Sequence, residues 1–185
     1  MRPLQDPKLT PTSHIVLGLL DGAAGELTPY DLKQLMAISV DNFWSTPHAQ
    51  VYREPARLAT GGYVVERREP EGRRRRFFAI TDKGRAALEA WRRQAPDEAP
   101  ELRDAGVLKL FFGADPALVA AHQLPLHEAK LAEYRTLRAA IAASVPAGQL
   151  LALDTGILHE EAMIAMWRVV AAGAPERPPT SGPRA

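Results

Sequence analysis

Side chains that donate hydrogen bonds or carry positive charge gather between residues 43 and 81. Amide and hydroxyl groups suit base edges and phosphate oxygens, and each arginine that neutralises a phosphate releases counterions. Four arginines stand in a row within this stretch. The residues that we predict to contact double-stranded DNA are Ser45, Thr46, His48, Gln50, Tyr52, Arg53, Arg73, Arg74, Arg75 and Arg76.

Several of these residues have an alternative interpretation. His48 can be a packed histidine with satisfied hydrogen bonds, and Tyr52 can belong to the core because its ring falls near the apolar side of a helix. An arginine run is often no more than a solvated surface. The local charge favours DNA: residues 67–93 hold nine Arg and one Lys against four acidic residues, while the whole chain carries +1. Gln50 is the predicted base reader, because its amide can pair with adenine.

A helix over residues 46–58 is predicted to present the first group of these side chains. Ser45 can cap it, and its apolar positions are few and small, which suits a helix that enters a major groove. An ordinary amphipathic surface helix is the alternative. Pro55 cannot donate to the carbonyl of Val51, so we predict a kink or an early helix end there.

A hairpin is predicted to present the arginines. Gly61 and Gly62 end the preceding helix, and a strand begins at Tyr63. Residues 70–72 form a turn, and a second strand over residues 73–80 returns to a helix capped by Thr81. A hairpin with a cationic tip directly after a helix is the layout of a winged helix.

Two more helices are predicted on the N-terminal side of this unit. Thr12 or Ser13 can cap the first, and Thr28 followed by Pro29 can begin the second. We predict a mainly α fold with a small β-hairpin wing: a winged helix-turn-helix domain and a C-terminal helical dimerisation domain. The predicted segments are a flexible arm over residues 1–12, the winged helix over 13–95, the helical domain over 96–173 and a disordered tail over 174–185.

The second half of the chain is rich in Ala and Leu, and this composition predicts helices. Asp115 and Pro116 form a cap and first position, and Pro125 is predicted to divide a short helix from a long one. Two long helices with apolar stripes cannot bury both stripes fully on each other, so a partner surface is expected, either the first domain or a second copy. The residues predicted to form a dimer are Leu131, Tyr134, Ile141, Leu153, Ile157, Ile164 and Trp167.

Composition argues against several other classes of protein. The 185 residues are 46% hydrophobic and 24% charged, which permits a core, and no cysteine is present for disulfides or thiolate sites. No apolar run is long enough to span a bilayer, and the first residues lack the apolar core of a signal peptide, so a cytoplasmic protein is expected. The five histidines share no metal-ligand spacing, and no catalytic motif is recognisable. We therefore expect no enzyme activity, no metal and no cofactor.

Three segments together resemble the PadR-type winged-helix transcriptional regulators. They are SHIVLGLLDGAAGELTPYDLKQLM, FWSTPHAQVYREPARLATGGYVVER and RRRRFFAITDKGRAALEAW, and LFFGAD followed by two helices resembles the longer-tailed branch. The resemblance implies a homodimer that binds an inverted-repeat operator, usually as a repressor. It assigns Ser45, His48, Gln50 and Tyr52 to the recognition-helix motif. Pro55 departs from the family pattern, where an aliphatic residue is common.

The resemblance also raises the question of an effector, because some family members respond to phenolic acids or hydrophobic drugs. Aromatic and Met side chains of this chain can line a pocket for a small aromatic or hydrophobic effector, although such residues at helical spacing are more often core. The predicted pocket residues are Trp91, Phe111, Phe112 and Met163. The alternative function is a ligand-sensing or protein-interaction module with a winged-helix fold and no specific operator.

Overall fold

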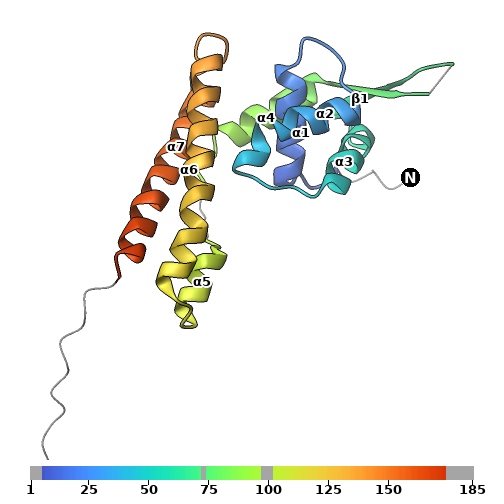
Figure 1. Ribbon diagram of the computed structural model, residues 1–185. Helices are drawn as coiled ribbons and strands as arrows, with labels where there is room; N and C mark the ends of the chain where they lie inside the picture. Colours follow the sequence, from blue (N-terminus) through green and yellow to red (C-terminus); the bar gives the residue numbers. More distant parts are fainter. Residues whose placement is uncertain (1–5, 72–73, 97–101, 174–185) are drawn as a thin grey trace, which may run out of the picture. The chain divides into compact units, whose positions relative to one another are not determined.

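The computed structural model describes residues 6–71, 74–96 and 102–173 (Figure 1). The chain divides into two compact units, residues 1–99 and residues 100–185. The tail predicted over residues 174–185 lies outside the described residues. The described part is helical apart from a two-stranded hairpin, so the predicted fold class is confirmed, while the dimerising role of the second unit stays a prediction.

Unit 1 is built from helices that pack around one core, with the hairpin extending away from them (Figure 1). Its elements in chain order are α1 (Pro11–Gly22), α2 (Pro29–Ala37), the 3-10 turn η1 (Val40–Asn42), α3 (His48–Thr60), β1 (Val64–Arg68), β2 (Arg76–Ile80) and α4 (Asp82–Arg92). The predicted caps Thr28 and Thr81 are confirmed at the starts of α2 and α4. The core includes Val16, Leu17, Leu32, Met36, Val51, Leu58, Phe78 and Leu88.

Helix α1 begins earlier than predicted. Its N-cap is Thr10, whose side chain accepts from the backbone N–H of Ser13, while the Ser13 hydroxyl accepts from the backbone N–H of Thr10. Pro11 takes the first helical position, where its missing N–H costs nothing. Thr12 and Ser13 are therefore buried inside the first turn, and the prediction that one of them is the cap is wrong.

The end of the predicted flexible arm is also held to unit 1. Asp6 accepts a hydrogen bond from Lys83 at 2.7 Å, and the carbonyl of Lys8 accepts one from Arg57 at 3.0 Å. Leu9 packs against the core. Residues 6–10 are thus anchored by contacts with residues far along the chain, which the proline-rich composition of the arm did not indicate.

Helix α3 continues through Pro55 to Thr60, so the predicted early end is wrong, while a kink at Pro55 stays a prediction. Pro55 leaves the carbonyl of Val51 without its helical donor, but its ring is fully buried in the core together with Val51 and Leu58. Apolar burial on both sides of the proline therefore holds the helical course. Gly61 caps the helix, and Gly62 follows with a φ of +72°, a conformation that glycine adopts without strain.

Strands β1 and β2 pair antiparallel, with Val64 opposite Ile80 and Arg68 opposite Arg76. Leu27 pairs with Phe78 on the other edge of β2 and ties the loop before α2 to the base of the hairpin. Helix α4 approaches this base closely, since a Cβ atom added to Gly84 would lie 2.1 Å from the backbone oxygen of Tyr63. The hairpin is thus fixed to the helices at one end only.

The described residues of unit 2 form three helices, α5 (Ala105–Phe111), α6 (Pro116–Ile141) and α7 (Ala147–Ala171). Asp115 caps α6 as predicted, with Pro116 in the first position. The predicted division at Pro125 is wrong, because α6 passes through it without a break. Pro125 and Ala121 are both exposed, so water can satisfy the Ala121 carbonyl that the proline leaves without a donor.

Helices α6 and α7 pack along each other as an antiparallel pair (Figure 1). Leu131, Tyr134, Ile164 and Trp167 are buried within the chain. Ion pairs follow the same seam, including Arg135 with Glu161 at 2.7 Å, Arg168 with Glu128 at 2.9 Å, and Arg138 with Asp154. The two helices therefore bury part of the predicted stripe on each other and leave the rest only half-buried, so neither stripe is fully covered within the chain.

This packing divides the predicted dimer residues by their burial. Four of them are buried within their own chain, namely Leu131, Tyr134, Ile164 and Trp167. The other three, Ile141, Leu153 and Ile157, are half-buried. The large apolar side chains that stay exposed on α6 and α7 are Leu118, Leu126, Leu151, Leu158 and Val169. Heptad spacing identifies an apolar stripe but not which helix covers it, so the dimer role of the seven predicted residues stays a prediction. No helix within the described part of the chain is long and apolar enough to cross a membrane.

Candidate nucleic-acid interface

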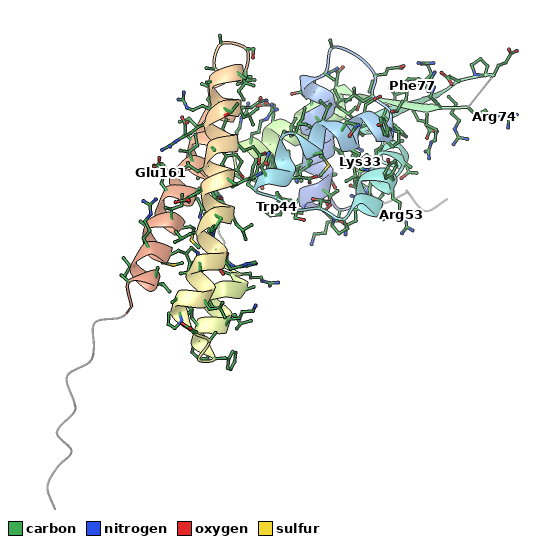
Figure 2. All side chains as sticks on the ribbon, in the orientation of Figure 1. Lys33, Trp44, Arg53, Arg74, Phe77 and Glu161 are labelled. Atoms are coloured by element: carbon green, nitrogen blue, oxygen red, sulfur yellow. The ribbon has the colours of Figure 1, made fainter. Side chains whose placement is uncertain are left out.

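The outer face of α3 carries the exposed side chains of the predicted recognition helix. Val51 and Leu58 face the core, while Arg53 is exposed, and Figure 2 shows it pointing away from the helices. Tyr52 is 43% exposed, so the alternative that it belongs to the core is wrong. Arg53 has no ion-pair or hydrogen-bond partner among the described residues, which leaves its guanidinium available to a phosphate or a base.

The N-terminal end of this helix is more mixed than predicted. Ser45 is exposed, whereas Thr46 is only 7% exposed and its hydroxyl has no hydrogen-bond partner among the residues that the structure describes. Thr46 is thus unavailable to DNA, because its small side chain packs inward. His48 opens α3, and its side chain lies outside the described part of the structure. Pro47 takes the N-cap position without a side-chain hydrogen bond, so the predicted cap Ser45 is wrong.

One side of α3 is held against the first turn of α1 by a polar seam, defined as Thr12 and Ser13 of α1 with Gln50, Glu54 and Arg57 of α3. The Ser13 hydroxyl donates to Glu54 at 2.6 Å, and Arg57 Nη2 donates to the Ser13 oxygen at 2.8 Å. Arg57 Nε also donates to Glu54 at 2.9 Å. Gln50 Oε1 accepts from the Thr12 hydroxyl at 3.2 Å. The seam sets the position of α3 relative to α1.

Glu54 is the centre of this seam and is 8% exposed. Burial raises the pKa of its carboxyl, but the hydrogen bonds from Arg57 and Ser13 outweigh that effect, and the net pKa is lowered. Glu54 therefore stays ionised as the partner of Arg57. Arg57 is committed to this internal pair, which makes it a positioning residue in the structure rather than a DNA contact.

The wing arginines are not equivalent. Arg74 lies near the end of the hairpin (Figure 2), is exposed and has a φ of +48°. Its side chain has no hydrogen-bond or ion-pair partner in the part of the chain that the structure describes, and Arg73 lies outside that part. Arg75 pairs with Glu69 at 3.1 Å, and Arg76 pairs with Glu66 at 2.7 Å. Arg74 is therefore the wing cation most available to an incoming phosphate.

Glu66 neutralises an unfavourable pair in the sheet. Arg68 and Arg76 stand directly opposite each other, and like charges in that relation destabilise a hairpin. Glu66 accepts hydrogen bonds from both, at 2.6 Å from Arg68 Nε and 2.8 Å from Arg76 Nε. The hydrogen bonds from Arg76, and then those from Arg68, lower the pKa of Glu66 to about 2. Two arginines of the hairpin are thereby held along its surface.

Aromatic contacts stiffen the same strands. The Arg67 guanidinium lies 4.5 Å from the centre of the Phe77 ring and pairs with Glu26 at 2.6 Å. Arg76 lies 5.2 Å from the ring centre of Phe78. The acidic partners Glu26, Glu66 and Glu69 were not predicted from the sequence. A signal was present at Glu66 and Glu69, which flank Arg67 and Arg68 in the sequence.

Comparison with known proteins agrees with this geometry. Residues 16–90, which include α2, α3, the hairpin and most of α1 and α4, match the family "Transcriptional regulator PadR-like family". Residues 16–90 form a PadR-like domain. The resemblance that the sequence segments suggested is therefore confirmed for this part of the chain.

A curated relative of the PadR-like domain is the negative transcriptional regulator PadR of Bacillus subtilis. It is 29% identical over 101 residues, which cover 54% of this chain and 54% of the relative. The matched segment thus spans about half of that relative's length.

Solved structures with the same fold extend over most of the chain. Bacillus subtilis PadR in complex with operator DNA gives a TM-score of 0.75 at 23% identity, covering 86% of this chain and 96% of that one. The same protein in complex with p-coumaric acid gives 0.69 at 21% identity, covering 89% and 97%. The Vibrio cholerae virulence activator AphA gives 0.65 at 28% identity, covering 87% and 96%.

The residues predicted to form an effector pocket have different surroundings. Trp91 follows the PadR-like domain in α4 and stacks on His14 of α1, with ring centres 4.7 Å apart. In unit 2, Phe111 is 81% exposed and meets Phe112 edge to face, while Met163 is buried in the core with Trp167. The effector pocket stays a prediction.

Unit 2 has a groove of its own between α6 and α7, with a volume of about 450 Å³. Leu131 and Ile164 contribute apolar side chains, and the Arg135–Glu161 and Arg168–Glu128 ion pairs contribute its charged lining. The four predicted pocket residues do not line this groove.

Proposed function

We propose that this chain is a sequence-preferring, DNA-binding transcriptional regulator that acts as a homodimer on an inverted repeat, as a repressor. The observation that carries the proposal is the pairing of an exposed α3 face with a hairpin that ends in an available cation, Arg74, within a PadR-like domain. Bacillus subtilis PadR, which shares this fold, has been solved in complex with operator DNA.

The two parts of this surface have different tasks in the proposal. Helix α3 enters the major groove, where Gln50 meets base edges and Tyr52 and Arg53 meet phosphates or bases. Ser45 and the side chain of His48 belong to the same contact region. The hairpin follows the phosphate backbone with Arg73, Arg74 and Arg75, and its contribution is independent of sequence. Arg76 joins only if it exchanges Glu66 for a phosphate.

Dimerisation is assigned to unit 2 through side chains that its internal core leaves exposed. Leu151 and Leu158 are seven residues apart on α7 and so lie on one face, and both are more than half exposed. A second copy that covers this face removes apolar surface from water, which favours association. A dimer places two α3 helices on one duplex. Because the two copies are related by two-fold symmetry, the DNA site that they bind is expected to be an inverted repeat.

A small-molecule effector is the second part of the proposal. Bacillus subtilis PadR has also been solved with p-coumaric acid, which favours a small aromatic acid as the class to test here. In the proposed role, binding of such a compound causes the protein to dissociate from its operator. The role requires no catalysis and no cofactor, and it places the chain in the cytoplasm with its DNA. The alternative is an interaction module that has the same fold and binds no specific operator.

Selection from a random-sequence duplex library at low salt tests the proposal directly. The expected result is an enriched inverted repeat with half-sites near one helical turn or a multiple apart, which footprinting upstream of the chain's own gene also reports. Enrichment of no sequence, with binding that follows charge alone, would overturn the specific-operator function. Addition of p-coumaric acid to the shift assay separates a sensor from an unliganded repressor.

A further inference from the structure

The contact between Thr12 and Gln50 fixes one end of the side chain that is proposed to read bases. Gln50 Oε1 accepts from the Thr12 hydroxyl at 3.2 Å, across 38 positions of sequence. Thr12 is 8% exposed, whereas Gln50 is exposed. The Gln50 amide nitrogen has no hydrogen-bond partner among the described residues. The amide is therefore turned so that its oxygen faces α1 and its NH2 group is left for another acceptor.

We propose that Thr12 is a positioning residue for base readout, because it orients the Gln50 amide and presents only its NH2 group to the DNA. This inference rests on the proposed function of α3. Glutamine pairs with adenine through both amide ends, since adenine offers one acceptor and one donor in the major groove. With the oxygen directed at Thr12, Gln50 presents a donor alone. It then favours acceptor edges, namely guanine N7 and O6, adenine N7 or thymine O4.

The rest of the polar seam explains why this contact persists. Ser13 is bonded to Glu54 at 2.6 Å and to Arg57 at 2.8 Å, one residue along α1 from Thr12. These charge-assisted bonds hold the first turn of α1 at a fixed spacing from α3. Thr12 does not cap α1, because Thr10 does, so its hydroxyl is free for Gln50. The polar seam thus connects α1 to the Gln50 side chain, which is proposed to face the major groove.

The test compares Thr12→Val with Thr12→Ser in the full chain. Valine keeps the shape and burial of threonine without the hydroxyl, and serine keeps the hydroxyl. Both are measured on duplexes that carry each of the four bases at every position of the sequence enriched by the wild-type protein. Gln50→Ala identifies the base position that Gln50 reads, and Thr12→Val/Gln50→Ala completes a double-mutant cycle.

We expect Thr12→Val to shift base preference about 3- to 10-fold toward adenine at the Gln50 position alone, because the freed amide can then pair with adenine through both ends; the change has the size of one neutral hydrogen bond. Thr12→Ser should behave as wild type, and Thr12→Val should have no further effect in the Gln50→Ala background. The salt dependence should not change in any of the variants, because no phosphate contact is lost.

Three results would overturn the inference. The first is unchanged discrimination in Thr12→Val while Gln50→Ala relaxes it. The second is an equal effect of Thr12→Val with and without Gln50, which indicates a general structural role. The third is no effect of Gln50→Ala at all. If the wild-type protein enriches no sequence, the proposed function fails as well, so the two failures are distinguishable.

Discussion

At the scale of single residues, the wing arginines differ in whether each guanidinium has a carboxylate partner. Arg75 and Arg76 are held by Glu69 and Glu66, whereas Arg74 has no partner in the described part of the chain. Exposed ion pairs contribute little stability, so an arginine in such a pair can exchange its carboxylate for a phosphate. That exchange lowers the net gain from binding DNA, and an unpaired arginine avoids this cost.

Replacement of Arg74 by Ala should weaken binding to all duplexes alike and reduce the slope of log K against log salt by about 0.9. Replacement of Arg76 by Ala should change the salt slope by less than replacement of Arg74, because Arg76 already forms an ion pair with Glu66. Titration of binding with salt on one specific and one scrambled duplex measures both. Equal slopes for Arg74→Ala and wild type would contradict the assignment of Arg74.

Glu66→Gln should act in the opposite direction. Loss of this carboxylate frees Arg68 and Arg76, so binding to any duplex should tighten several-fold and the salt slope should steepen by up to about 0.9. Glu133→Gln in unit 2 changes the net charge equally at a site remote in sequence and serves as the control. A matching gain in the control would mean that net charge, rather than release of the wing arginines, is responsible.

The wing ion pairs should also be insensitive to mild acid. The pKa of Glu66 is lowered to about 2 by its arginines, so its contribution to stability is present above the unfolded pKa. That contribution is lost only as pH falls through about 2. We therefore expect the difference in DNA affinity between Glu66→Gln and wild type to stay constant across the pH range in which the protein stays folded. A difference that disappears near the ordinary carboxyl pKa would show that the pairs do not form.

At the scale of elements, the hairpin depends on a close approach by α4. A Cβ atom at Gly84 would lie 2.1 Å from the Tyr63 oxygen and 2.8 Å from the Ile80 side chain. Gly84→Ala should lower the free energy of unfolding by about 2 kcal/mol or more, because the clash is with backbone. Gly18→Ala is the matched control: nothing lies within 4 Å, and the helix propensity of alanine should raise stability by about 1 kcal/mol.

Urea unfolding followed by circular dichroism measures both glycine variants. A Gly84→Ala protein as stable as wild type would show that α4 does not approach β1 as described. Loss of DNA binding in Gly84→Ala alone is expected, since the strand that it displaces leads into the wing.

The two helix prolines offer a second comparison between elements. Pro125 is exposed, so Pro125→Ala should stabilise unit 2 by about 1 to 3 kcal/mol, because it restores a backbone hydrogen bond without loss of burial. Pro55 is fully buried, so Pro55→Ala gains the same bond but loses about 1.6 kcal/mol of apolar burial. The thermal midpoints of the two variants should rank Pro125→Ala above Pro55→Ala. The reverse order would contradict the burial assigned to the Pro55 ring.

At the scale of the whole molecule, the proposed dimer requires a face that the single chain leaves uncovered. Leu158 is 64% exposed on α7, near the middle of the apolar row that includes Leu151. Leu151→Glu/Leu158→Glu should convert the dimer to a monomer and weaken operator binding, because both half-sites are no longer held together. Gln149→Glu places a charge on the opposite side of the same helix and should leave the dimer intact.

Light scattering on the purified full chain reports the mass of each variant. A monomeric wild-type protein, or a double variant that stays dimeric, would exclude this face as the dimer contact. Circular dichroism of the double variant should match that of wild type, since neither leucine belongs to the core of the chain.

The sequence by itself determined where several helices of this protein begin and end and that a hairpin follows α3, but not that α6 runs through Pro125. Thr28 with Pro29, Thr81, Gly61 with Gly62, and Asp115 with Pro116 mark helix ends through interactions that reach only three or four residues. The motif segments likewise indicated the family of residues 16–90. Such signals act locally, so they need no knowledge of the fold.

Only the tertiary structure decided which of these side chains are available. Thr46 and Trp167 are buried within the chain. Arg76 forms an ion pair with Glu66, and the amide oxygen of Gln50 accepts a hydrogen bond from Thr12. Pro55 stays helical because core packing on both sides of it outweighs one missing hydrogen bond. Each outcome depends on a partner that is distant in sequence or on the core as a whole. Local propensity cannot specify such a partner, because the contact exists only once the chain has folded.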